Sequence, residues 1–289
     1  MCRLFGLSAS PHRVHASFWL LDAPDSLVEQ SWREPDGTGL GTFAADGTPV
    51  LEKRPFAAHE DKQFAIEAKH RYSTTFIAHV RFATTGDVLP RNTHPFEQHG
   101  RLFAHNGVVQ NLPRLEAELG SDLRLVRGDT DSERVFALIT RHIERNNGDV
   151  TAGITTAVGW LADNVPTYAL NFILTTPDEL WALRYPDTHD LLFLERHPGG
   201  PSGSRHLQQT SGTGRIRARS ENLAEHPAVV VASEQMDEDR GWTPLRSGEL
   251  LHVDRELGTS RELILDRPPR YPICLDDLSA RAKAAQAQQ

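Results

Sequence analysis

Cysteine is almost absent from this chain, since only Cys2 and Cys274 occur among its 289 residues. Two cysteines cannot form the network of disulfides that stabilises small secreted domains. The chain is long enough to bury a large hydrophobic core without covalent links. We therefore expect both thiols to be free and the protein to work in the reducing environment of the cytoplasm.

Long apolar segments and an excess of positive charge are also missing. No apolar run approaches the roughly 20 residues that cross a bilayer, and the stretch SFWLL at residues 17–21 is too short for the core of a signal peptide. The 31 lysines and arginines are outnumbered by 39 acidic residues, for a formal net charge of −8. A non-specific nucleic-acid binder needs a basic face. The sequence therefore predicts neither a membrane nor a nucleic-acid partner.

The hydrophobic pattern predicts helices and strands in the first half of the chain and mostly strands in the second. Helices are expected at residues 14–21, 25–34, 60–72, 128–148 and 150–166. Asp25 and Thr130 are the predicted N-caps, and Glu133 should complete a capping box with Thr130. Strands are expected at residues 2–10, 74–86, 101–109, 168–176, 179–186, 190–196, 228–234 and 249–254.

The chain shows no internal repeat and no linker that would separate two domains. We expect one α+β domain at residues 2–275, with two helical layers around two sheets. A polar loop rich in glycine and serine, at about residues 197–222, should be mobile. Residues 276–289 should form a tail that frays or folds into a short helix.

Cys2 becomes chemically unusual if the initiator Met1 is removed. Aminopeptidases excise an initiator methionine when the next side chain is small, and cysteine qualifies. The new first residue then carries a nucleophilic sulfur and a free α-amine whose pKa is about 8, so that a useful fraction is neutral at pH 7. This amine can accept the thiol proton, which places nucleophile and base on one residue. Taken alone, a cysteine at position 2 is equally compatible with an inert thiol.

Two charged residues at the ends of predicted elements are candidates for binding an amino acid. Arg81 ends an apolar strand, where its guanidinium can hold a carboxylate, although a surface salt bridge explains it as well. Asp131, in GDTDSE, falls at the first position of a helix, where the dipole favours an ionised carboxylate that can bind an ammonium group. Stabilisation of its own helix is the simpler interpretation of Asp131 alone.

Asn106-Gly107, in AHNGVVQN, can supply two hydrogen-bond donors to one oxygen. The asparagine offers its side-chain amide, and the glycine lets a ligand approach its backbone N–H. Such an oxyanion hole contributes about 3–4 kcal/mol per donor. An Asn-Gly pair is also the strongest short signal for a tight hairpin turn, and the strand at 101–109 would then break there.

These stretches together describe a site for glutamine. One side chain suits an α-carboxylate and one an α-ammonium, a thiol can attack a carbonyl, and an Asn-Gly pair can hold the resulting oxyanion. In chain order, they resemble the motifs of class II glutamine amidotransferases, which are N-terminal-nucleophile hydrolases. The matching stretches are Cys2, Arg81 in RFATTG, His94-Pro95-Phe96, Asn106-Gly107 and Asp131 in TDSE.

The resemblance covers nearly the whole chain and implies a four-layer αββα sandwich. It implies that Cys2 is the nucleophile, that its α-amine is the base, and that Asn106 and Gly107 form the oxyanion hole. The residues that it places around the substrate are Arg81, Thr84, His94 and Asp131, with His94 supporting the active-site loop. It implies no cofactor and no metal. The substrate is glutamine or a γ-glutamyl amide.

Two departures from the family pattern bear on the substrate and the partner. The family stretch Arg-Gly-x-Asp-x-x-Gly reads REPDGTG here, so that Glu34 stands where the family has a glycine and the pocket wall must differ. The 289 residues leave no room for an ammonia-accepting domain after the matching stretches, and we therefore expect that a separate synthase subunit would take that role. The chain is most similar to short members such as uncharacterised amidotransferase-like proteins and the γ-glutamyl amidase of ergothioneine biosynthesis.

Two other functions compete with an amidohydrolase. A catalytically idle glutamine-binding or scaffolding module would keep Met1, which blocks the α-amine. A metal hydrolase would use some of the histidines His79, His94, His99 and His105, but these show no HExxH motif and no closely spaced ligand pair.

Overall fold

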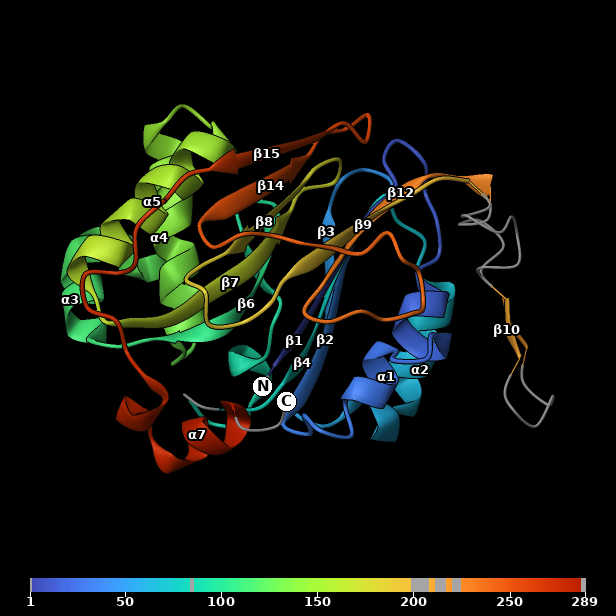
Figure 1. Cartoon of the computed structure of the whole chain (residues 1–289), viewed down its shortest axis with the longest axis horizontal. Coiled ribbons are helices and arrows are strands. Elements are labelled where there is room, and N and C mark those ends of the chain that lie inside the picture. The colour runs from blue at the N-terminus through green and yellow to red at the C-terminus, as the bar shows by residue number, and fades with distance from the viewer. Residues whose placement is uncertain (1, 84–85, 199–207, 211–216, 220–224, 287–289) are drawn as a thin grey trace.

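Two antiparallel sheets lie face to face at the centre of the protein, and helices cover the outer face of each sheet (Figure 1). The computed structural model describes residues 2–83, 86–198, 208–210, 217–219 and 225–286. The order of the layers is helix, sheet, sheet, helix. This arrangement confirms the predicted α+β class and the four-layer αββα sandwich.

One sheet is built around the N-terminal strand β1 (Arg3–Ser8). Its other strands are β2 (Gly37–Phe43), β3 (Pro49–Arg54), β4 (Thr75–Arg81), β9 (Leu192–Arg196), β12 (Ala228–Ala232) and β13 (Thr243–Pro244). They follow the order β13-β9-β12-β1-β4-β2-β3. Because β1 lies between β4 and β12 and is covered on both faces, all its residues are buried.

The second sheet carries the Asn-Gly pair. It comprises β5 (Phe96–Gln98), β6 (Arg101–Val109), β7 (Thr167–Thr175), β8 (Leu180–Arg184), β14 (Glu249–Val253) and β15 (Thr259–Leu263). These strands follow the order β15-β14-β8-β7-β6-β5. Two short strands outside both sheets, β10 (Gln208–Thr210) and β11 (Arg217–Arg219), pair with each other.

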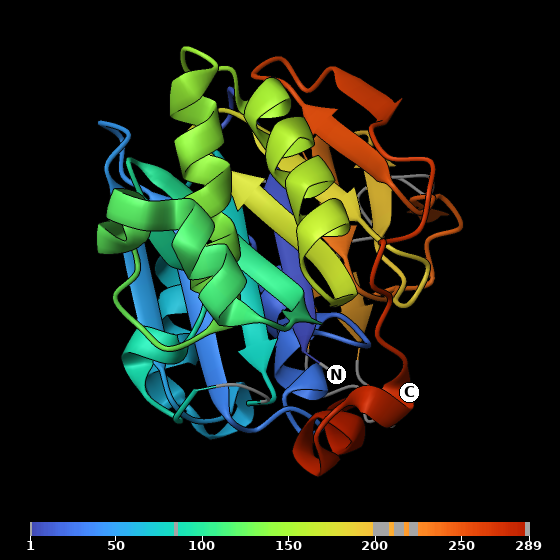
Figure 2. The same ribbon diagram turned by 90° about the vertical axis from the view of Figure 1, so that its left-hand side faces the viewer.

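The helices fall into two outer layers (Figures 1 and 2). Against the first sheet lie η1 (Phe18–Asp22), α1 (Leu27–Gln30), η2 (Ala58–Glu60) and α2 (Lys62–His70). Against the second lie α3 (Leu112–Leu119), η4 (Gly120–Leu125), α4 (Asp131–Arg145) and α5 (Val150–Asn164). Other helices among the described residues are η3 (Pro90–Asn92), η6 (Leu275–Asp277) and α7 (Ala280–Gln286). Within the described part of the chain, no helix combines the length and the apolar character that crossing a membrane requires.

Successive side chains of each strand point to opposite faces of the sheet, and this alternation divides the hydrophobic core into layers. In β1, Phe5 and Leu7 pack toward the first helical layer, whereas Leu4 packs between the sheets. Behind the second sheet, the rings of Phe103 and Phe136 stack with their centroids 4.8 Å apart. Burying such a side chain contributes about 1.5–3 kcal/mol. The two sheets are held against each other by a separate layer of buried side chains that includes Leu4, Ile77, Leu102 and Ile173.

One predicted N-cap and one half of the predicted capping box differ in the structure. The N-cap of α1 is Ser26, whose side chain accepts a hydrogen bond from the Glu29 N–H, and Asp25 lies outside the helix. Thr130 caps α4 as predicted and accepts from the Glu133 N–H at 3.3 Å. The Glu133 carboxylate, however, accepts from the Gly128 N–H at 2.6 Å, so the structure shows this bond rather than the predicted reciprocal half of the capping box.

The prediction that Asn106-Gly107 breaks its strand is wrong. Both residues pair with β7 inside β6, in the register Asn106↔Asn171 and Gly107↔Leu170. A Cβ on Gly107 would lie 1.9 Å from the carbonyl oxygen of Ala169. Glycine is therefore required here because the neighbouring strand comes close, and not because the chain turns.

Most of the loop predicted at about 197–222 lies outside the described residues; the described parts of it include β10 and β11. Of the tail predicted at 276–289, residues up to 286 are described, and they contain α7. Leu278 and Ala282 pack against Val108, Tyr168 and Ala169 of the second sheet. The division into a domain at 2–275 and a tail stays a prediction.

Candidate active site

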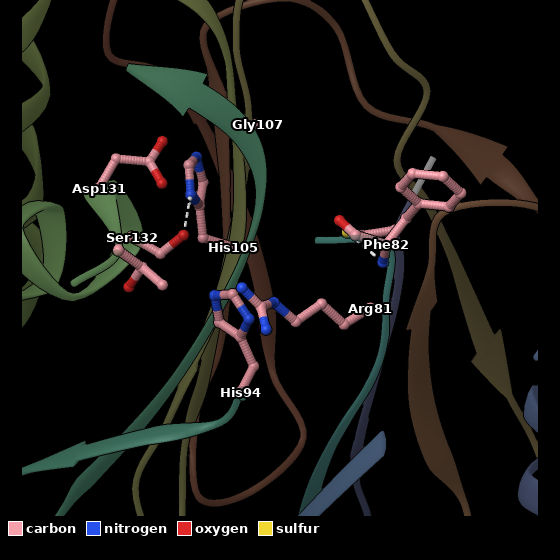
Figure 3. A pocket seen from close by; sticks show the side chains of 9 residues that line it. Arg81, Phe82, His94, His105, Gly107, Asp131 and Ser132 are labelled. Atoms are coloured by element: carbon pink, nitrogen blue, oxygen red, sulfur yellow. Dashed lines mark hydrogen bonds between the residues drawn. The ribbon is translucent and has the colours of Figure 1, made fainter. Parts of the chain in front are cut away.

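A small cleft lies where the two sheets and α4 meet (Figure 3). The register of β1 with β4 pairs Arg3 with Val80, so that Cys2, one residue before β1, comes opposite Arg81 at the end of β4. The other wall comes from β6 and from the first turn of α4. The residues that line the cleft are Cys2, Arg81, Phe82, His94, His105, Gly107, Thr130, Asp131 and Ser132.

Cys2 is half-buried and its thiol is free. Its sulfur accepts a hydrogen bond from the Phe82 N–H at 3.2 Å and lies 3.4 Å from the Phe82 carbonyl oxygen. Burial, and then the charge of Glu34, raise the pKa of this thiol to about 11, although the Phe82 N–H and Arg81 act in the opposite direction. The thiol is therefore protonated at neutral pH, and nucleophilic attack needs a base that removes its proton.

Glu34 is a functional candidate that the sequence identified only as a changed pocket wall. Its side chain is 0% exposed, and one carboxylate oxygen lies 3.8 Å from a guanidinium nitrogen of Arg3. Burial raises the pKa of Glu34 to about 7, against the effect of the positive charge of Arg3. An acidic group that ionises near neutral pH thus acts on the electrostatics of the neighbouring thiol.

We predict that Glu34→Gln lowers the pKa of the Cys2 thiol. An ionised carboxylate disfavours the thiolate, so its removal should shift the midpoint of Cys2 alkylation by iodoacetamide to lower pH by on the order of one unit. Because Glu34 itself ionises near pH 7, the two proteins should differ most above that pH. Alkylation followed by mass spectrometry at each pH measures the midpoint.

Glu234→Gln is the matched control, because Glu234 also pairs with Arg3, at 2.6 Å, but is 34% exposed in its side chain. This control should leave the midpoint of Cys2 alkylation unchanged. An unchanged or higher midpoint in Glu34→Gln would contradict the effect assigned to Glu34.

Arg81 and Asp131 extend into the cleft from its two sides (Figure 3). Arg81 is 3% exposed, and its guanidinium donates to the carbonyl oxygens of Asp87 at 3.2 Å and Gly86 at 3.4 Å. Asp131 is the first residue of α4 and accepts a hydrogen bond from the Val109 N–H at 2.9 Å. A buried cation and a buried carboxylate on opposite walls can hold the two charged groups of an α-amino acid.

The side chain of Asn106 and the cleft lie on opposite faces of β6, whereas the donor predicted at Gly107 is a backbone N–H, which lies in the plane of the sheet. Gly107 lines the cleft, as does His105 two residues earlier. Asn106 is 2% exposed and lies on the other face, which Leu102 and Ala104 turn toward the space between the sheets. Its side-chain nitrogen is buried and has no hydrogen-bond partner among the described residues. A buried donor without an acceptor costs free energy, which an oxyanion could recover.

The histidines around the cleft form a neutral cluster. The rings of His79 and His94 lie 4.2 Å apart, and His94 also contacts Phe96 at 4.6 Å. Burial and then the charge of Arg81 lower the pKa of His79 to about 3, and burial followed by the nearby histidines lowers that of His94 well below its usual value. Burial lowers the pKa of His105 as well. These rings therefore add no positive charge near pH 7.

The four histidines proposed as metal ligands do not form one group. His99 lies in the turn between β5 and β6 and contacts Glu144 at 2.5 Å. The Nδ1 of His105 forms a hydrogen bond with the Ser132 hydroxyl at 2.9 Å, which the dashed line in Figure 3 marks. Among the residues that the structure describes, no three histidine, cysteine or acidic side chains are arranged to hold a metal ion.

Gly39, which the REPDGTG stretch keeps, allows His94 to reach the cleft. A Cβ on Gly39 would lie 1.8 Å from the carbonyl oxygen of His94. Only a glycine in β2 leaves room for the His94-Pro95 backbone at this point.

The structure brings together most of the predicted site residues. Cys2, Arg81, His94, Gly107 and Asp131 line one cleft, with Asn106 beside it, whereas Thr84 lies outside the described residues. Sequence reasoning missed Phe82 and Ser132 and considered His105 only as a metal ligand. His105 and Gly107 are two residues apart in a predicted strand, and this spacing could have shown that both lie on the same face of it.

The cleft encloses a volume of only about 20 Å³. This is the room of about one water molecule.

Comparison with known proteins places the chain among amidotransferases. Residues 1–266 match the model of a family described as "Glutamine amidotransferases class-II". The chain is similar to the "Probable glutamine amidotransferase DUG3" of Saccharomyces cerevisiae, with 23% identity over 89% of this chain and 82% of that protein. It is also similar to a "Putative glutamine amidotransferase" of Haemophilus influenzae, with 25% identity over 92% of this chain and 90% of that protein.

A solved structure supports the fold independently. Glutamine phosphoribosylpyrophosphate amidotransferase of B. subtilis superposes with a TM-score of 0.61 and 19% sequence identity. The superposition covers 92% of this chain and 50% of the B. subtilis chain. At this identity the likeness concerns the fold, and it locates the counterpart of this chain in half of a larger protein.

Proposed function

This chain belongs to the class II glutamine amidotransferases, and we propose that it hydrolyses the side-chain amide of glutamine or of a γ-glutamyl amide. The observation that carries the proposal is that the sulfur of Cys2 shares one buried cleft with Arg81 and Asp131. A nucleophile in the same cleft as a cation and a carboxylate suits an amino acid whose side chain is to be attacked. The products are glutamate and either ammonia or an amine.

Removal of Met1 would prepare the nucleophile. The exposed α-amine of Cys2, with a pKa of about 8, takes the thiol proton directly or through one water molecule. Such a base is needed because the pKa of the thiol is raised to about 11 in its buried position. The resulting thiolate forms a bond to the amide carbon, and the carbonyl oxygen becomes an oxyanion.

The tetrahedral intermediate then collapses to a thioester. The Gly107 N–H and the Asn106 side-chain amide are the donors that we assign to the oxyanion. The ammonium group of Cys2 returns its proton to the leaving nitrogen as the carbon–nitrogen bond breaks. Water, activated by the same amine, attacks the thioester, releases glutamate and regenerates the thiol.

We propose that charged side chains on the two walls of the cleft bind the α-carboxylate and the α-ammonium group of the substrate. Arg81 binds the α-carboxylate and Asp131 the α-ammonium, each from a buried position that strengthens its interaction. His94 supports the wall beside them through its contact with His79. A role for Thr84 in substrate contact stays a prediction.

The proposal also concerns the group attached to the amide nitrogen of the substrate and the destination of the released ammonia. Glu34 changes the wall next to Cys2, which is compatible with a substituted γ-glutamyl amide. A separate synthase subunit would accept ammonia that does not escape to solvent. The cytoplasmic location stays a prediction from the sequence.

The test is an assay of processed protein with L-glutamine, L-asparagine and a set of γ-glutamyl amides. Glutamate release from glutamine or from at least one γ-glutamyl amide, and none from asparagine, is the expected result. The mass of the intact protein should show that Met1 is absent. Retention of Met1 together with glutamine binding but no turnover would favour an idle binding module instead.

A further inference from the structure

The C-terminal segment returns to the active site although it lies beyond the part of the chain that matches the family. The family model ends at residue 266. The Thr167 N–H donates to the Tyr271 carbonyl oxygen at 3.1 Å, and the Ile273 N–H donates to the Thr167 carbonyl oxygen at 3.1 Å. Figures 1 and 2 both show α7 beside the N-terminal end of the chain. The family match therefore does not account for what this segment does there.

One side chain of α7 connects it to the wall that carries the nucleophile. A guanidinium nitrogen of Arg281 donates to the Asp36 carboxylate at 3.1 Å. The same carboxylate oxygen accepts a hydrogen bond from the Ala83 N–H at 2.8 Å. Ala83 directly follows Phe82, whose N–H and carbonyl both contact the sulfur of Cys2. A short series of contacts thus runs from α7 to the nucleophile.

The two interactions of Asp36 depend on each other. Its side chain is 21% exposed, so that the carboxylate could also turn toward solvent. The second donor, Arg281, favours the orientation in which the carboxylate holds the Ala83 N–H. Arg281 is 57% exposed, which leaves this ion pair sensitive to salt.

We propose that Arg281 is a positioning residue, which acts through Asp36 to hold the Phe82–Ala83 backbone against Cys2. The Phe82 N–H donates to the sulfur and favours the thiolate, so a displaced backbone makes the thiol harder to ionise. The consequence for turnover rests on the proposed function, whereas the consequence for the reactivity of Cys2 does not.

The first measurement is the alkylation of Cys2 by iodoacetamide across a range of pH. Arg281→Ala should alkylate about threefold more slowly near pH 8, with the midpoint shifted to higher pH, as expected for the loss of one partly exposed ion pair. Arg281→Lys should restore most of the rate. In the original protein, added NaCl should slow alkylation toward the rate of Arg281→Ala.

The second measurement separates a positioning role from a general change in stability. In an Asp36→Asn background, Arg281→Ala should have little further effect on alkylation, because both changes break the same series of contacts. With glutamine, or with the amide identified in the assay above, Arg281→Ala should lower kcat about threefold to fivefold with little change in KM. Thermal unfolding should be nearly unchanged.

Lys283→Ala is the matched control, since Lys283 lies on the same helix but pairs with Asp276 at 3.2 Å. It should leave the alkylation of Cys2 unchanged. An alkylation profile of Arg281→Ala identical to that of the original protein, or an equal loss in the Asp36→Asn background, would overturn the proposal. A slowed alkylation without any amide turnover would refute the proposed function alone.

Discussion

A Cys2→Ala variant will release no glutamate above background from glutamine or from any γ-glutamyl amide. The sulfur forms the proposed acyl intermediate, and its position beside Phe82 in the cleft cannot be taken by another described thiol, because Cys274 is exposed near the C-terminus. Removal of a nucleophile lowers kcat by at least about 10³-fold. Initial rates of glutamate release, with single-turnover experiments as a check, measure the loss.

This substitution is informative because alanine is also small, so that removal of Met1 should proceed as it does ahead of cysteine. The mass of the purified variant verifies the processing. Cys274→Ala is the control and should retain full activity. Glutamate release by Cys2→Ala at the original rate would show that the mechanism is wrong, and so would an electrophilic glutamine analogue that labels a different side chain.

The Arg81→Ala variant should raise the KM for the amino-acid substrate about 100-fold and change kcat much less. Arg81 is buried in the wall of the cleft, and the loss of a buried charge-assisted contact costs about 2–5 kcal/mol in binding. The contact with an α-carboxylate is present before and during the reaction, so its loss affects mainly KM. Steady-state kinetics over a wide range of substrate concentration measure the changes in KM and in kcat separately.

A substrate without the carboxylate distinguishes this role from a structural one. 4-Aminobutyramide has the side-chain amide and the amine of glutamine but no α-carboxylate. The original protein and Arg81→Ala should process it with similar kcat/KM. If Arg81→Ala impaired glutamine and 4-aminobutyramide equally, Arg81 would have a structural role in the cleft and no role in binding the carboxylate.

Local sequence patterns predicted the helices α2, α4 and α5, most central strands of the two sheets and most of the site, but not α3 or the edge strands β3, β5 and β15. α4 and α5 could be recognised because an apolar stripe follows a polar cap in each, a pattern that a few adjacent residues determine. The predicted N-cap of the short helix α1 was Asp25, but the structure has Ser26. Both residues are good N-caps, and only the packing of the chain selects Ser26. The strand through Asn106-Gly107 was misjudged because glycine can serve either a turn or a close approach of two strands.

Contacts between residues far apart in the chain were beyond the reach of these patterns. Glu34 was visible in the sequence as a substitution, but its complete burial next to Cys2 follows from the way β1 and β2 flank β4. Arg281 and Asp36 are separated by 245 positions, and no local periodicity relates them. Such contacts depend on the path of the whole chain.

The amino-acid sequence was enough to predict the type of chemistry, because a thiol at position 2, an arginine at a strand end and an aspartate at a helix start are each recognised from a few neighbouring residues. The electrostatic environment of that thiol could be seen only in the folded protein. Its proton affinity depends on burial and on charges at a few ångströms, and these are properties of packed layers rather than of a stretch of sequence.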